Sequence, residues 1–205
     1  MYSNLTSPAS ICPLELNFLR QHARIDNFDD DDVLQLYAQS ATEIVESYLS
    51  RYLLTRDVTW IASERPETSI YWQQVQPWQW SYFMRMSVIH LPRPASAVSE
   101  VAIGVWGQPD TILTEGTDYW LDLTTTVGRL KWLSSTYWTA YRDHVSVKFT
   151  SGYGPDPADI PVSIRHAVAL VTTALFERRG DQTANLWDDA MEGLLAPHKL
   201  SYFGA

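Results

Sequence analysis

Apolar residues recur at the helical period near both ends of the chain. After Pro13, apolar positions at residues 14–19 predict a short helix that ends near residues 22–25. A longer stripe, rich in tyrosine, predicts a helix over residues 30–53. Towards the C-terminus, the same spacing predicts helices over residues 161–179 and 183–195. Both ends of the chain are therefore expected to be helical.

The middle of the chain has a different sequence pattern, in which short apolar runs are separated by turn-forming residues. None of the segments between these runs is long enough for a crossover helix, which favours an antiparallel sheet over βαβ units. The fold class expected is α+β, a helical bundle of residues 1–54 and 160–205 with an inserted antiparallel β domain, residues 55–159. The predicted strands are residues 55–62, 86–91, 97–106, 119–123, 128–133 and 145–150.

Residues 63–83 form a polar segment, a long hairpin or a loop, that is unusually rich in aromatic side chains. These rings either cover an open face of the sheet or form a contact surface, because tryptophan and tyrosine are enriched at the centres of interfaces. A platform that stacks carbohydrate or bases is a third interpretation. The candidate interface residues in this segment are Trp72, Trp78, Trp80, Tyr82 and Phe83.

The segment after Pro197 mixes basic and aromatic side chains and is too short to fold alone. It is either a frayed terminus or a segment that gains order by docking on another surface. Its candidate contact residues are His198, Lys199, Tyr202 and Phe203.

Composition and charge exclude several classes of protein. A chain of 205 residues with 45% hydrophobic and 19% charged residues is that of an ordinary globular protein, long enough for one domain or one domain with an insertion. It shows no membrane-length apolar run and no signal-peptide pattern at its start, so synthesis in the cytoplasm is expected. The single cysteine, Cys12, cannot form an internal disulfide. A net charge of −9 disfavours a tight grip on DNA phosphates.

Four consecutive acidic residues, Asp29, Asp30, Asp31 and Asp32, precede the long predicted helix. Carboxylates at this position cap free N–H groups and interact favourably with the helix dipole. A calcium loop is the rival interpretation, but it needs spaced acids, a central glycine and a closing glutamate. Capping is therefore the expected role.

The sequence offers little catalytic chemistry. The five histidines lie on different elements without metal-ligand spacing, and no nucleophile-elbow motif is present. The glycine-rich run at residues 152–155 lacks the lysine and the following helix of a phosphate loop. We therefore expect no enzyme activity, no cofactor and no metal. A small hydrolase with an unrecognised site remains an alternative.

The order of several motifs resembles the head–tail connector (adaptor) proteins of tailed double-stranded DNA phages and gene transfer particles. The resemblance extends from Leu14 to Leu200 and begins with the acidic, tyrosine-striped helix. The motifs that follow are HLPRP at residues 90–94, YWLD at 119–122, GRL at 128–130, VSVKFTSGY at 145–153, IPVSIR at 160–165 and LLAP at 194–197.

This resemblance implies a subunit of the virion neck, made in the host cytoplasm, with a helical body and an inserted β domain. It implies a homo-oligomeric ring, commonly of twelve copies, that binds beneath the portal protein and extends the DNA channel. The ring also docks a stopper or tail-completion protein; DNA passes without specific binding, and no membrane is involved. Residues 29–32 are then candidates to face the channel. The aromatic segment departs from the family pattern, and a monomeric module that grips carbohydrate or peptide through it is the alternative function.

Overall fold

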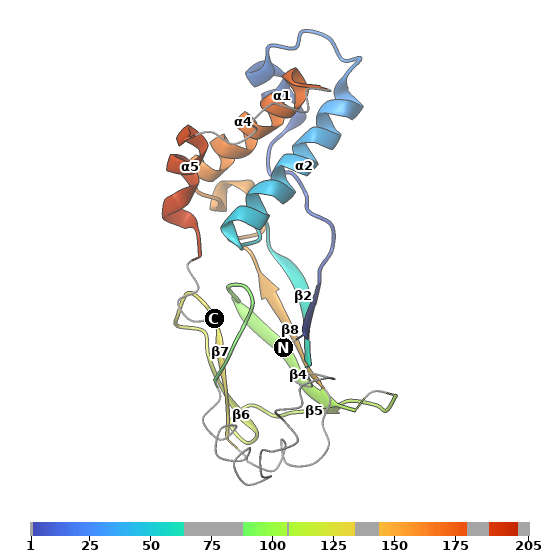
Figure 1. The fold of residues 1–205 in the computed structure, drawn as a ribbon, viewed down its shortest axis with the longest axis vertical. Coiled ribbons are helices and arrows are strands. Elements are labelled where there is room, and N and C mark those ends of the chain that lie inside the picture. The colour runs from blue at the N-terminus through green and yellow to red at the C-terminus, as the bar shows by residue number, and fades with distance from the viewer. Residues whose placement is uncertain (1, 64–87, 106, 134–143, 180–188, 201–205) are drawn as a thin grey trace, which may run out of the picture. The chain divides into compact units, whose positions relative to one another are not determined.

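A computed structural model describes residues 2–63, 88–105, 107–133, 144–179 and 189–200 of the chain (Figure 1). It combines α-helices with antiparallel sheets, so the predicted α+β class is confirmed. The chain divides into two compact units, which are described separately below. The sheet unit comprises residues 1–8 and 56–151, and the helical unit comprises residues 9–55 and 152–205.

All three boundaries of this division differ from those predicted, the one at residue 55 by a single position. The prediction placed the first eight residues with the helices, but β1 (Tyr2–Thr6) pairs antiparallel with β2 (Arg56–Ser63). Residues 152–159 were expected in the β domain, whereas they lie in the helical unit. There, the Tyr153 amide donates to the Leu53 carbonyl over 3.1 Å, which holds the returning chain beside the end of the helical segment.

The helical unit is built on four α-helices within its described residues. The helix α2 is shorter than predicted because Ser50 adopts a left-handed conformation, with φ of 54°, and caps the helix end. The helix predicted over residues 183–195 is described only from residue 189, and residues 183–188 lie outside the described part. The helices are α1 (Leu16–Ala23), α2 (Asp31–Leu49), α4 (Val162–Glu177) and α5 (Asp189–Leu195), with short 3-10 turns η3 (Pro157–Asp159) and η4 (Ala196–His198).

The core of the helical unit lies between α2 and α4. From α2 it receives Ala41, Val45 and Leu49, and from α4 it receives residues that include Ala167 and Val168, all fully buried. The alanines leave little side chain between the two helices, so valine and leucine side chains can interdigitate around them. Met191 and Leu195 of α5 complete this cluster. None of the helices among the described residues has the length and apolar character that a bilayer-spanning segment needs.

The sheet unit contains two antiparallel sheets. The larger has the strand order β1-β2-β8-β4-β5, and the smaller has the order β3-β7-β6. The smaller sheet buries Ile89, Leu130 and Trp132 on one face. The remaining strands are β3 (Val88–His90), β4 (Ala97–Gly104), β5 (Thr111–Ile112), β6 (Tyr119–Asp122), β7 (Arg129–Trp132) and β8 (His144–Ser151).

The chain re-enters the helical unit at Gly152, which has a φ of 142°. A Cβ atom at this position would lie 2.5 Å from both the nitrogen and the Cα of Thr55, so no side chain fits. The next residues continue this contact, since the Thr55 amide donates to the Gly154 carbonyl over 2.9 Å. Close approach of the two backbones therefore requires glycine at position 152.

Gly152→Ala is expected to lower the free energy of unfolding by about 2 to 4 kcal/mol, because it adds both left-handed strain and a clash with backbone atoms. Gly107→Ala is the matched control: its φ is also positive, at 86°, but a Cβ there meets nothing within 4 Å. The control should lose only about 1 kcal/mol. Urea unfolding of both variants measures the difference, and equal losses would contradict the proposed clash.

Candidate functional site

The four consecutive aspartates lie at the start of α2, as predicted, but Asp30 does not cap the helix. It occupies the N-cap position with φ of −96° and ψ of 8°, outside the extended conformation of a capping residue, and its side chain makes no capping hydrogen bond. Its carboxylate instead pairs with Arg179 at 3.3 Å, and Asp31 pairs with Arg20 of α1 at 3.4 Å. Asp29 and Asp32 are exposed. The capping prediction is therefore wrong for Asp30, whose charge ties α2 to the residue just beyond α4.

The described part of the C-terminal segment packs on the helical unit itself. His198 Nε2 lies 2.9 Å from the Ser163 hydroxyl at the start of α4, and the Lys199 ammonium lies 4.3 Å from the centre of the Tyr48 ring. Leu200 is buried, and its amide donates to the Leu49 carbonyl over 3.2 Å. His198 and Lys199 thus contact their own chain.

The remaining predicted contact residues lie outside the described residues, so their role stays a prediction. They are Trp72, Trp78, Trp80, Tyr82, Phe83, Tyr202 and Phe203.

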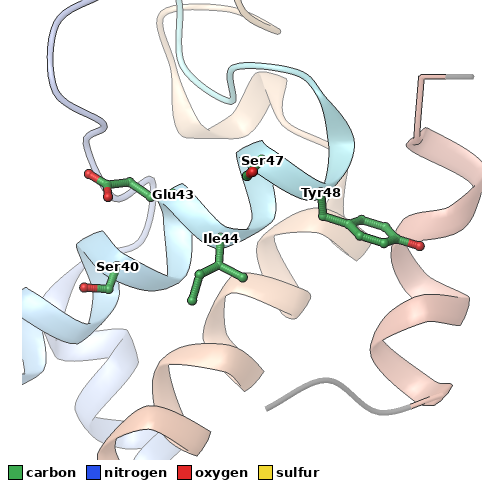
Figure 2. A pocket seen from close by; sticks show the side chains of 5 residues that line it. All are labelled: Ser40, Glu43, Ile44, Ser47 and Tyr48. Atoms are coloured by element: carbon green, nitrogen blue, oxygen red, sulfur yellow. The ribbon is translucent and has the colours of Figure 1, made fainter. Parts of the chain in front are cut away.

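A shallow hollow of about 760 Å³ follows the outer side of α2 (Figure 2). Ile44 and Tyr48 give it an apolar floor, and Glu43 gives it a carboxylate. The Tyr48 hydroxyl donates to Glu192 over 3.4 Å. Desolvation, together with the negative charge of Glu192, raises the pKa of Tyr48 above its ordinary value, so the phenol stays protonated. Ser40 and Ser47 complete the lining.

A second hollow of about 410 Å³ lies between the start of the helical unit and α2. Its lining is largely apolar and includes Ile11, Leu16 and Cys12. Desolvation by burial raises the pKa of the Cys12 thiol, which keeps it in the poorly nucleophilic neutral form. The physical setting of Cys12 is therefore that of a packing residue.

The exposed face of the smaller sheet is a candidate contact surface that the sequence reasoning missed. Trp120 of β6 is 51% exposed and is paired in register with Lys131 of β7. One pair further along the same face, Asp122 and Arg129 form an ion pair at 3.2 Å. Hydrogen bonds from the Thr124 side chain and amide, with a smaller contribution from Arg129, lower the pKa of Asp122 and keep it ionised. The surface thus presents an indole beside charged groups.

Glu46 is a buried side chain that the sequence reasoning also missed. It is 3% exposed, and its carboxylate accepts hydrogen bonds from the Ser10 hydroxyl at 2.7 Å and from the Leu53 amide at 2.8 Å. The available signal was its place between Val45 and Leu49 on the apolar side of the predicted helix. This carboxylate joins the N-terminal segment of the helical unit to both the end of α2 and the residues that follow it.

No metal-binding cluster is present among the described residues, where no three histidine, cysteine, aspartate or glutamate side chains converge. Two of the histidine side chains lie close to polar groups of other elements. His144 lies 3.1 Å from Asp110, and His22 lies 2.9 Å from the Thr173 hydroxyl.

Comparisons with known proteins agree with the resemblance found in the sequence. Residues 14–72 match the model of the phage gp6-like head-tail connector proteins. The fold matches chains in solved structures of gene transfer agent (GTA) particles. A chain in the neck of an empty particle, with C6 symmetry, has a TM-score of 0.69 and 18% identity, with 100% of this chain and 99% of that chain covered.

A chain in the neck of a native particle, with C12 symmetry, gives the same TM-score, identity and coverage. A chain in the native virion has a TM-score of 0.67, 19% identity and 98% coverage of both chains. No curated protein matches the sequence. The resemblance to head–tail connector proteins is confirmed.

Glu46→Gln tests the buried carboxylate. The amide keeps the shape but replaces one charged acceptor with an N–H₂ donor, which faces either the Ser10 hydroxyl or the Leu53 amide. The free energy of unfolding should fall by about 2 kcal/mol, the value of a hydrogen bond to a charged group. Glu43→Gln, an exposed change on the same helix, should change it by less than about 0.5 kcal/mol. Thermal and urea unfolding of both variants would contradict this role if Glu46→Gln were as mild as its control.

Proposed function

We propose, from this resemblance to head–tail connector proteins, that the chain is a structural subunit of the neck of a phage or phage-like particle. Copies form a ring, of twelve in the resemblance, that binds beneath the portal protein and extends the DNA channel. The far side of the ring docks a stopper or tail-completion protein. One observation carries the proposal: the fold matches neck chains over 100% of this chain and 99% of theirs.

The division of the chain supports a helical body whose two segments flank residues 56–151 of the sheet unit, while residues 1–8 of the sheet unit precede both. The family model covers residues 14–72, which include α1 and α2. The helical unit is completed by residues that follow the sheet unit in sequence. In this proposal the helical body builds the wall of the ring. The exposed sheet face around Trp120 and the aromatic segment at residues 63–83 are candidates for contacts with other neck proteins.

The negative charge of the chain suits the wall of a channel through which DNA passes without binding. With a net charge of −9, the chain repels phosphate, and a wall that repels phosphate does not retain DNA. Asp30 and Asp31 are paired with arginines inside the helical unit, so the exposed charges of the cluster are those of Asp29 and Asp32. We propose that this end of α2, with Asp29, Asp30, Asp31 and Asp32, faces the channel.

The role proposed is structural and non-catalytic, because the likeness is to components of particles. No cofactor is part of the proposal. The subunit acts by shape, by the contacts that it makes with its neighbours and by the charge that it presents.

Electron microscopy of a reconstituted neck tests the ring directly. Purified chain mixed with purified portal protein is expected to form a ring coaxial with the portal, with a central channel continuous with the portal channel. The portal alone provides the control image. A chain that stays monomeric and never associates with the portal would overturn the proposed function and favour a monomeric binding module.

Replacing Asp29 and Asp32 with lysine tests the channel charge. The double variant should bind double-stranded DNA in a salt-sensitive manner that the unmodified chain lacks, because lysines recruit phosphates and release counterions. Glu115→Lys with Asp57→Lys changes the net charge equally at exposed positions of the sheet unit. DNA retention by portal-bound rings of each variant is the measurement. Equal retention by both variants would contradict a special role for the start of α2.

A further inference from the structure

We propose that two outward faces of the helical unit bind each other in neighbouring copies, the α2 face of one copy against the α1–α4 face of the next. The α2 face is the hollow at Glu43, Ile44 and Tyr48 together with the exposed Leu36. The α1–α4 face consists of Phe18, His22, Val162 and His166. The inference rests on the proposed ring and assigns its lateral contact to named residues.

The α2 face includes residues opposite the helical core, Leu36 and Glu43, and residues on the flank of the helix, Ile44 and Tyr48, that pack partly against the core. Ala41, Val45 and Leu49 of α2 are fully buried against α4. At 100° per residue, Leu36 and Glu43 fall on the opposite side of the helix. Leu36 is 59% exposed, although leucine is a residue that interfaces and cores bury. Further along the same helix, the hollow has Ile44 and Tyr48 as its apolar floor and the Glu43 carboxylate beside them.

The α1–α4 face also points away from the core. Ala167 and Val168 of α4 contact the α2 side, whereas Val162 and His166, one turn apart, lie on the opposite side of α4. Val162 is 71% exposed. The His166 ring lies 6.3 Å from that of His22, which lies 6.1 Å from that of Phe18. Apolar groups and imidazoles are therefore grouped on one surface.

The two faces carry apolar and hydrogen-bonding groups that can pair with each other. One has an apolar hollow with a carboxylate, and the other has a projecting phenyl ring, 48% exposed, with an exposed imidazole. An aromatic anchor seated in a hollow is the usual centre of a protein interface. The imidazole N–H of His166 can donate to the Glu43 carboxylate, which adds a charge-assisted hydrogen bond. These complementary groups identify a second copy of the chain as the occupant.

The directions of the two faces explain why the contact leads to a ring. Because they lie on opposite sides of the α2–α4 pair, one copy cannot satisfy both with a single partner across a two-fold axis. Each copy must use one face for the preceding neighbour and the other face for the following neighbour. Such heterologous contacts close into a ring when the rotation between copies divides a full turn.

A charge swap tests the contact in the full chain. Glu43→Arg removes the carboxylate that accepts from His166, and His166→Glu places two carboxylates against each other, so each single variant should weaken self-association at least about tenfold. The double variant, which restores an Arg–Glu pair at every interface, should return to within about threefold of the unmodified chain. Sedimentation velocity and native mass over a range of concentrations measure the association. Circular dichroism confirms that each variant is folded.

Two further variants make the test specific. Phe18→Ser removes the exposed anchor without touching the core, and self-association should again fall at least about tenfold. Glu115→Arg, an exposed change in the sheet unit, is the control and should leave it unchanged. The proposal is overturned if the unmodified chain does not self-associate, if the single variants behave like the control, or if the double variant stays as weak as the single ones. Rings on the portal that tolerate Glu43→Arg would retain the proposed function and reject these faces.

Discussion

The burial of one carboxylate, that of Glu46, links several segments of the helical unit. Glu46 is almost fully removed from water, and a charge in that position is stable only while hydrogen-bond donors surround it. The Ser10 hydroxyl and the Leu53 amide supply two of them. These bonds hold the incoming N-terminal segment and the chain that leaves α2. Leu53 also accepts from Tyr153, where Gly152 allows the returning backbone to come close. The contacts of Glu46 and Leu53 thus hold three segments together: the N-terminal segment, the chain that leaves α2 and the chain that returns at Gly152.

The close packing between α2 and α4 fixes the orientation of the outward faces of the helical unit relative to each other. Ala41 and Val45 pack against Ala167 and Val168, and all four residues are fully buried. Because close-packed interiors deform little, this packing fixes the orientation of the two helices relative to each other. A ring needs this property, because a small error in the angle between two contact faces accumulates around the circle.

The aspartates at the start of α2 show how one charged motif can have two physical roles. Asp30 and Asp31 pair with arginines, which satisfies their charge and positions α2 relative to α1 and the end of α4. Asp29 and Asp32 remain exposed and add to the negative field of the surface. Neutralising the whole motif would therefore change both the folding of the unit and its repulsion of phosphate, and the two effects can be separated only residue by residue.

The sequence by itself determined the elements whose signal is local. Apolar spacing predicted α2 and α4, punctuated runs predicted most of the strands, and the order of motifs predicted the resemblance that the comparisons confirm. Tertiary structure alone decided what depends on distant partners. The polar β1 is a strand because β2 lies beside it, and Asp30 is an ion-pair residue because Arg179 reaches it. Glu46 is buried because Ser10 and Leu53 converge on it. Periodicity reports which side of an element is apolar, but pairing and burial depend on residues far away in the sequence, and those partners are set only when the chain is folded.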